Sequence, residues 1–310
     1  MSSPEVSVQG FWKRYGSTVA VKGISFQVNR GEIFALLGPN GSGKTSTLES
    51  LEGLRRPDGG SLSIAGIDPG RQARRLRNLI GVQLQSSALP PAMTVEEAMG
   101  FFCRYHGVAV RHDLVERLGL AEKRRVQYVK LSVGQQRRLS LAIAVAHDPR
   151  VLFLDEPTAG LDVQSRAQLH ELVGELQRKG TTVILATHDM AEAEKLADRA
   201  AILLRGEIAA VGSPRQLTAA GGRQTRISVS TEKGSLLQGE IAFPAAAARA
   251  RTDGYACYMS ENPARTVSAI LAWLERSGDP LVDLRVERPS LEERFLQITA
   301  GNKTKKGESR

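Results

Sequence analysis

The chain has few cysteines and few aromatic residues. Its two cysteines, Cys103 and Cys257, lie far apart in the sequence, which excludes a disulfide framework or a cysteine-rich zinc site. This cysteine usage fits a reducing compartment. Aromatic residues make up only 5% of the chain, which argues against stacking platforms for single-stranded nucleic acid.

No segment is long and apolar enough to predict a membrane span. A helix needs about 20 mostly apolar residues to cross a bilayer. The best runs here, Leu141–Ala146 and Val183–Ala186, are much shorter. The N-terminal sequence MSSPEVSVQG also lacks the basic and apolar regions of a signal peptide. We therefore expect a soluble protein that reaches a membrane only through partner subunits.

The length of the chain indicates more than one core, and its net charge allows three interpretations. A chain of 310 residues is long for a single core, so we expect one large and one small domain. The formal charge of +9 suits an anionic ligand, an anionic membrane surface or a merely solvated basic surface.

Alternating apolar and amphipathic segments predict an α/β fold for residues 5–220. Two continuous apolar strands around one amphipathic helix indicate a right-handed parallel crossover. Thr94 and Glu97 form a capping box for a helix in an inserted helical block, and Arg137 and Arg138 fall on the wet side of another. The expected elements are strands and turns at 5–37, helices at 45–52, 94–105, 134–147 and 163–179, and strands at 151–154 and 182–187.

A glycine-rich turn between a buried strand and a helix carries the strongest motif, GxxxxGK[ST]. Glycines let the backbone wrap a phosphate with its N–H groups pointing inward, and the positive end of the following helix adds attraction. Lys44 would reach the β- and γ-phosphates, and the Thr45 hydroxyl would bind Mg²⁺. The residues expected to bind nucleotide here are Gly38, Pro39, Asn40, Gly41, Ser42, Gly43, Lys44, Thr45 and Ser46.

Two carboxylates follow a run of four apolar residues at 151–154. Asp155 and Glu156 emerge at the carboxyl end of this strand, where open parallel sheets bind ligands. We expect Asp155 to hold Mg²⁺ through water and Glu156 to act as the general base on the attacking water.

A third motif, Leu131-Ser-Val-Gly-Gln135, opens a helix. Together the three motifs resemble the nucleotide-binding domain of ATP-binding cassette (ABC) transporters, whose signature is LSGGQ. The resemblance implies that Ser132, Gly134 and Gln135 contact ATP held by a second subunit. Val133 departs from the pattern. Its backbone is either strained at positive φ or ordinary at negative φ, and we favour the second.

The resemblance assigns roles to four further positions. Tyr15 resembles the aromatic residue that stacks on adenine, and His188 resembles the switch histidine that contacts the γ-phosphate. Gln85 resembles the glutamine that links the γ-phosphate and Mg²⁺ to the membrane subunit, with Gln83 as a rival in register. Residues 159–162 resemble the loop that crosses the dimer interface.

The resemblance also implies a fold, a cofactor and partners. We expect a P-loop NTPase with a parallel-sheet core, an antiparallel β subdomain and an inserted helical subdomain. ATP and Mg²⁺ are the expected ligands, and two copies of this chain are expected rather than two different chains. Separate integral-membrane permease subunits would hold the dimer at the cytoplasmic face of the cell membrane.

The sequence of residues 217–224 resembles a linker, and the alternating strand-like and helix-like stretches of residues 225–300 predict a small α+β domain. The basic tail 301–310 is expected to be disordered. The segment Pro289–Leu296 resembles the closing helix of the small domain in drug- and polysaccharide-exporter cassettes, which favours export of a drug, lipid or glycan over import. The expected elements are strands at 225–231, 237–242 and 281–287 and helices at 263–276 and 290–298.

Two other functions fit the motifs less well. A soluble cassette that works on nucleic acid or ribosomes would carry heptad-rich insertions or a second cassette, and neither occurs here. A regulatory subunit that binds ATP without turnover would need a damaged Glu156 or His188, and both are present. We therefore expect no nucleic-acid partner.

Overall fold

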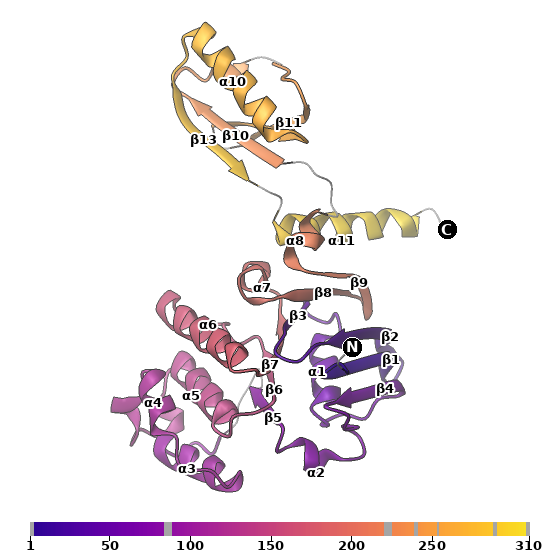
Figure 1. Ribbon diagram of the computed structural model, residues 1–310, viewed down its shortest axis with the longest axis vertical. Helices are drawn as coiled ribbons and strands as arrows, with labels where there is room; N and C mark the ends of the chain where they lie inside the picture. The colour runs from indigo at the N-terminus through magenta and orange to yellow at the C-terminus, as the bar shows by residue number, and fades with distance from the viewer. Residues whose placement is uncertain are drawn as a thin grey trace. The chain divides into compact units, whose positions relative to one another are not determined.

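The chain folds into two compact units, Met1–Pro214 and Arg215–Arg310 (Figure 1). The computed structural model describes residues 3–83, 89–219, 225–238, 241–252, 254–287 and 290–307. Within these ranges no helix is both long enough and apolar enough to cross a bilayer.

A six-stranded sheet forms the centre of the first unit, with the strand order β5-β6-β7-β3-β8-β9. Its first five strands are parallel, and the last pair is antiparallel. Every residue of β3, β6 and β7 is buried, as expected for parallel strands covered on both faces. The predicted parallel core is confirmed. The strands are β3 (Ile33–Leu37), β5 (Ile80–Gln83), β6 (Val151–Asp155), β7 (Thr182–Thr187), β8 (Arg199–Leu204) and β9 (Glu207–Gly212).

A three-stranded antiparallel sheet, in the order β2-β1-β4, packs beside this core. It comprises β1 (Val6–Tyr15), β2 (Thr18–Val28) and β4 (Gly59–Ile64). Phe26 of β2 stacks on Phe34 of β3 with ring centroids 5.1 Å apart, which joins the two sheets. Helix α1 (Lys44–Leu51) contributes Leu48 and Leu51 to the same apolar cluster. The predicted antiparallel β subdomain is confirmed.

A block of helices follows β5 in the chain. Helix α3 (Val95–Tyr105) and α4 (His112–Arg117) both pack against α5 (Val133–Val145) (Figure 1). The predicted capping box is confirmed, since the Thr94 hydroxyl accepts from the Glu97 N–H and the Glu97 carboxylate accepts from the Thr94 N–H. The remaining helical segments of this unit are α2 (Ala73–Leu76), short turns at Ala121–Lys123 and Tyr128–Lys130, α6 (Val163–Arg178) and α7 (Met190–Leu196).

The second unit holds a four-stranded antiparallel sheet in the order β11-β12-β10-β13. Ile270 and Leu274 of α10 join Ile227 and Val229 of β10 in its apolar core. The elements are α8 (Pro214–Ala219), β10 (Thr225–Thr231), α9 (Ser235–Gln238), β11 (Ala246–Thr252), β12 (Tyr255–Ser260), α10 (Pro263–Ser277), β13 (Leu281–Glu287) and α11 (Leu291–Gly307).

Two expectations for the second unit are wrong, and two of its strands were not predicted. The strand expected at 237–242 is the helical turn α9 at its start, because Asp279 accepts hydrogen bonds from the N–H groups of Lys233 and Ser235 and turns the chain there. Strands β11 and β12 were not predicted, since the alanine-rich sequence of β11 has a weak strand pattern. Helix α11 continues into the tail expected to be disordered, as far as Gly307.

Helix α11 carries Glu292 and Glu293 in its first turn. Acidic residues at the start of a helix interact favourably with the helix dipole. The linker expected at 217–224 begins inside α8, and residues 220–224 lie outside the described residues.

The separation of the cores predicts that the first unit folds alone. Its two apolar clusters are built, within the described ranges, from residues up to Ile208. A chain ending after Ala219 should therefore unfold in one cooperative thermal transition, within a few degrees of the first-unit transition of the full chain. Circular dichroism melts of both chains test this. A truncated chain without a cooperative transition would contradict the division.

Candidate functional site

The glycine-rich loop between β3 and α1 encloses one side of a cavity of about 670 Å³. Gly43 has φ 106°, and a Cβ there would lie 2.7 Å from the Ala20 carbonyl oxygen, so only glycine fits this close approach. Helix α1 begins at Lys44, directly after the loop, and its positive end faces the loop. The cavity is lined by Tyr15, Thr18, Val19, Ala20, Lys22, residues 39–46, Glu156 and Arg205.

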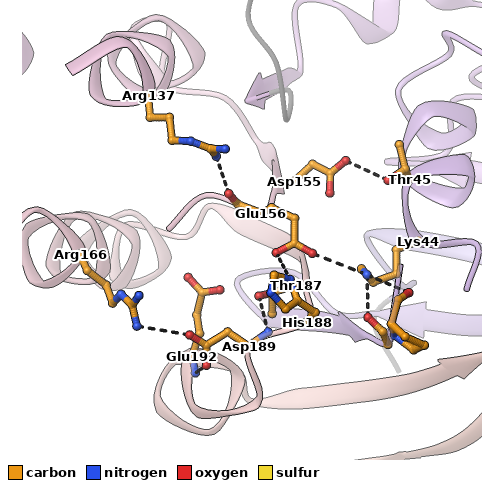
Figure 2. A network of polar contacts seen from close by, with 12 residues as sticks. Lys44, Thr45, Arg137, Asp155, Glu156, Arg166, Thr187, His188, Asp189 and Glu192 are labelled. Carbon is orange, nitrogen blue, oxygen red and sulfur yellow. Dashed lines mark hydrogen bonds and ion pairs between the residues drawn. The ribbon is translucent and has the colours of Figure 1, made fainter. Parts of the chain in front are cut away.

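Lys44 is the buried cation of this cavity. Its ammonium donates to the carbonyl oxygens of Gly38 at 2.7 Å and Pro39 at 3.3 Å. The same ammonium lies 3.6 Å from Oε1 of Glu156 (Figure 2). A buried cation beside a glycine-rich loop and the start of a helix suits the phosphates of a nucleotide.

Asp155 and Thr45 meet at the edge of the cavity. The Thr45 hydroxyl donates to Oδ2 of Asp155 at 3.2 Å. Oδ1 of Asp155 is buried without a hydrogen-bond partner in the described part of the chain. Burial raises the pKa of the Asp155 carboxyl, and the hydrogen bond from Thr45 partly offsets this effect. A hydroxyl and a free carboxylate oxygen are hard ligands of the kind that Mg²⁺ prefers.

Protein groups alone do not complete a metal site here. Among the described residues no group of three or more histidine, cysteine, aspartate or glutamate side chains could hold an ion. Magnesium in phosphate-transfer sites is commonly bound by one or two protein ligands together with substrate phosphates and water. The Thr45–Asp155 pair therefore fits Mg²⁺ that arrives with a nucleotide.

Glu156 and His188 form the closest side-chain contact of the site. Oε2 of Glu156 lies 2.7 Å from Nδ1 of His188, and both residues follow parallel strands of the central sheet (Figure 2). Glu156 is 7% exposed, whereas the His188 side chain is 59% exposed. A buried carboxylate held by an exposed imidazole can orient a water molecule and accept its proton.

Helix α6 fixes the loop that carries His188. Arg166 lies 3.3 Å from Asp189, and the buried His170 ring lies 3.5 Å from the buried Glu192 carboxylate. Asp189 also caps α7 by accepting from the Glu192 N–H. The Arg166–Asp189 contact (Figure 2) and the His170–Glu192 contact together join α6 to the segment that starts α7.

Tyr15 lies at the mouth of the cavity, at the end of β1. Its side chain is among the exposed large hydrophobic groups at 39%, and its hydroxyl lies 3.3 Å from the Ser46 hydroxyl. The cations of Lys13 and Arg55 lie 5.4 Å and 5.6 Å from its ring centroid. An exposed ring beside a phosphate loop can stack on a nucleotide base.

The Leu131–Gln135 motif starts helix α5, outside the cavity around Lys44. The Ser132 hydroxyl accepts from the Gln135 N–H, and the Gln135 side chain accepts from the Ser132 N–H, which forms a second capping box. Val133 is the first helical residue, is 61% exposed and is not at positive φ. The expectation of an ordinary backbone at Val133 is confirmed. Neither Ser132, Gly134 nor Gln135 lines the cavity described above.

Of the two glutamines considered for the link between the γ-phosphate, Mg²⁺ and the membrane subunit, the structure describes only Gln83. Gln85 lies outside the described residues. Gln83 is the last residue of β5 and pairs with Leu154, next to Asp155 in β6. It is 1% exposed, and neither atom of its side-chain amide has a hydrogen-bond partner within the described ranges.

Several residues of the site were not predicted from the sequence. Arg137 donates to the backbone carbonyl of Glu156, although we expected Arg137 and Arg138 to face water, and both are half-buried. Thr18 and Lys22 line the cavity because β2 follows Tyr15 closely, which the position of Tyr15 could have suggested. Arg205 reaches the cavity from the turn between β8 and β9, and no sequence pattern marks it.

Comparisons with known proteins show which family the chain belongs to. Residues 21–159 match the family model for ABC transporters. The daunorubicin resistance ATP-binding protein DrrA3 of Streptomyces coeruleorubidus is 34% identical over 310 residues, 98% of each chain. The linearmycin resistance ATP-binding protein LnrL of Bacillus subtilis is 33% identical over 301 residues, 93% of this chain and 96% of that one. The chain belongs to the ABC transporter ATP-binding proteins.

Other ABC proteins match a shorter part of the chain. The Nod factor export ATP-binding protein I of Burkholderia pseudomallei is 43% identical over 223 residues, 70% of this chain and 73% of that one. The structure of cbiO1 from Clostridium perfringens, described as part of an ABC transporter complex, is 29% identical with a TM-score of 0.62. It covers 71% of this chain and 92% of the cbiO1 chain. The fold is therefore the P-loop NTPase fold of an ABC ATPase.

Glu52, at the end of helix α1, is a buried carboxyl that lines a second cavity. It is 8% exposed, and its Oε2 has no hydrogen-bond partner in the described part of the chain. Burial, with smaller contributions from the charges of Asp155 and Glu49, raises the pKa of Glu52 from 4.5 to about 8. The second cavity, of about 300 Å³, is lined by Glu52, Arg77, Phe102, Tyr105, His106 and His147 among others.

The raised pKa of Glu52 predicts a pH-dependent stability of this ABC protein. The folded state keeps a proton that the unfolded state loses above about pH 4.5, so this carboxyl lowers stability as pH rises from about 4.5 to 8. Glu52→Gln should therefore raise the free energy of unfolding at pH 8 by about 1–3 kcal/mol and change it little at pH 5. Urea unfolding at both pH values measures this.

Glu122→Gln is the matched control, because Glu122 is an exposed carboxylate. It should change neither the stability nor its pH dependence. Equal effects of Glu52→Gln at pH 5 and pH 8 would contradict the assigned pKa.

Proposed function

We propose that this chain is the ATP-hydrolysing subunit of an ABC exporter and works with separate integral-membrane permease subunits. One observation carries the proposal. The carboxylate of Glu156 lies between the Lys44 ammonium, at 3.6 Å, and the His188 ring, at 2.7 Å. The Lys44 cation, the Glu156 carboxylate and the His188 ring thus meet after the ends of three parallel strands, where α/β folds place their ligands.

The cavity around Lys44 would bind ATP. The backbone of residues 38–43 and the start of α1 hold the phosphates, and Lys44 pairs with the β- and γ-phosphates. The Tyr15 ring stacks on the adenine, and Ser46 lies within hydrogen-bond reach of the Tyr15 hydroxyl. The volume of about 670 Å³ is within the usual range for a small-molecule site.

Thr45 and Asp155 would hold Mg²⁺ with the phosphates, and Gln85 would complete this set. Bound Mg²⁺ supplies positive charge that stabilises the phosphates of the transition state. The protein side of the chemistry belongs to two residues. Glu156 orients the attacking water and takes its proton, while His188 holds the Glu156 carboxylate through Nδ1 and would contact the γ-phosphate through its other ring nitrogen.

A second copy of the chain would complete each site. Ser132, Gly134 and Gln135 lie at the exposed start of α5 and not in the cavity of their own chain. In a homodimer they would contact the γ-phosphate of the ATP held by the other copy, so two ATP molecules would join the two copies. Hydrolysis removes these contacts and lets the dimer reopen.

Export is the direction that the relatives favour. Both drug-resistance relatives match nearly the full length of this chain, and the third is named for Nod factor export. We infer that the cargo is a drug, a lipid or a glycan, that residues 5–220 form the ABC domain, and that residues 225–300 form an accessory domain. The permease subunits would hold the protein at the cytoplasmic face of the cell membrane.

Glu156→Gln tests the chemical assignment. The amide keeps the shape of the side chain but cannot accept a proton, so ATP turnover should fall by about 10²-fold or more. ATP binding should stay within about threefold of the wild-type value, because Lys44 and the loop are intact. Phosphate release and equilibrium nucleotide binding measure the two quantities. Wild-type turnover by this variant would exclude Glu156 as the base.

Tyr15→Ala tests the adenine site. Loss of the ring should weaken ATP affinity by about 1–3 kcal/mol and leave the rate at saturating ATP nearly unchanged. Tyr15→Phe keeps the ring and should keep the affinity. Tyr105→Ala, which removes an exposed tyrosine outside this cavity, is the second control. Unchanged affinity of Tyr15→Ala for both ATP and GTP would show that the ring does not contact the base.

A further inference from the structure

Arg137 connects the helix of the Leu131–Gln135 motif to the backbone of Glu156. Its Nη1 donates to the Glu156 carbonyl oxygen at 2.6 Å, and it reaches this oxygen from α5 (Figure 2). The bond goes to the main chain and not to the carboxylate. Arg137 can therefore act on the orientation of Glu156 without taking part in its proton chemistry.

The backbone of Glu156 needs such support. The backbone φ of Glu156 is +49°, in the left-handed region that residues other than glycine and asparagine rarely adopt. The Glu156 N–H donates to the Ala186 carbonyl at 2.9 Å, and its carbonyl also accepts from the Ala159 N–H at 3.3 Å. A sparsely populated backbone conformation persists only where the surrounding contacts hold it.

We propose that Arg137 is a positioning residue that keeps the Glu156 carboxylate aimed between Lys44 and His188. This inference rests on the proposed function, in which Glu156 is the base. Arg137 lies in the first turns of α5, close behind Ser132, which is proposed to meet the second copy's ATP. The hydrogen bond therefore makes the geometry of the base depend on the position of α5.

The neighbouring residue provides a matched control. Arg138 is also half-buried on α5, and its Nη1 donates to the Leu118 carbonyl at 2.9 Å, inside the helical block. Both arginines thus make one hydrogen bond to a backbone carbonyl, but only that of Arg137 reaches the nucleotide site. A general loss of helix packing would affect both variants alike.

Arg137→Met and Arg138→Met in the full chain separate the two roles. Arg137→Met should lower kcat by about tenfold or more and leave the KM for ATP within about threefold, since a displacement near 1 Å can cost that much in rate. Arg138→Met should keep kcat within about twofold. Arg137→Lys keeps a donor and should recover part of the rate, and it replaces Arg137→Met if that variant does not fold.

A double variant tests whether Arg137 acts through Glu156. In single-turnover assays, Arg137→Met in a Glu156→Gln background should lower the residual rate by less than about twofold, because residues that act as a unit are not additive. A further tenfold loss would show a separate role and overturn the proposal. Wild-type kcat in both Arg137 variants would overturn it as well. If Glu156→Gln itself turns over at the wild-type rate, the proposed function fails instead.

Discussion

The site depends on a buried carboxylate that is held from two sides. The side chains of Lys44 and His188 contact the Glu156 carboxylate, one on each side. Glu156 and these two partners come from three segments that are distant in the sequence. The parallel sheet brings the segments together, because the strands that precede Lys44, Glu156 and His188 are adjacent in the order β6-β7-β3 and end at the same edge.

The parts of this site that follow strands could be predicted from the sequence. The buried runs before Gly38, Asp155 and His188 fix both the strands and the edge where they end, so their spacing and residue types were enough. The capping boxes at Thr94 and Ser132 are local, and the one at Thr94 was predicted. Family, fold and nucleotide binding are confirmed, whereas the roles of the individual residues remain predictions.

The remaining features depend on contacts that local sequence does not encode. Arg137 has the appearance of a surface residue in its helix, and only the tertiary position of α5 brings it to the Glu156 carbonyl. Glu52 has no motif, and its raised pKa arises from burial. In the second unit, the alanine-rich sequence of β11 is a weak strand pattern, and its pairing with β12 defines it as a strand. Neither β11 nor β12 was predicted.

The central claim is that this chain hydrolyses ATP in a site completed by a second copy. The most direct measurement is phosphate release by the full-length chain over a dilution series at saturating ATP and Mg²⁺. If a second copy completes each site, the specific activity should rise with protein concentration and level off once dimers form. A specific activity that stays constant across the series, or no release of phosphate at any concentration, would contradict it.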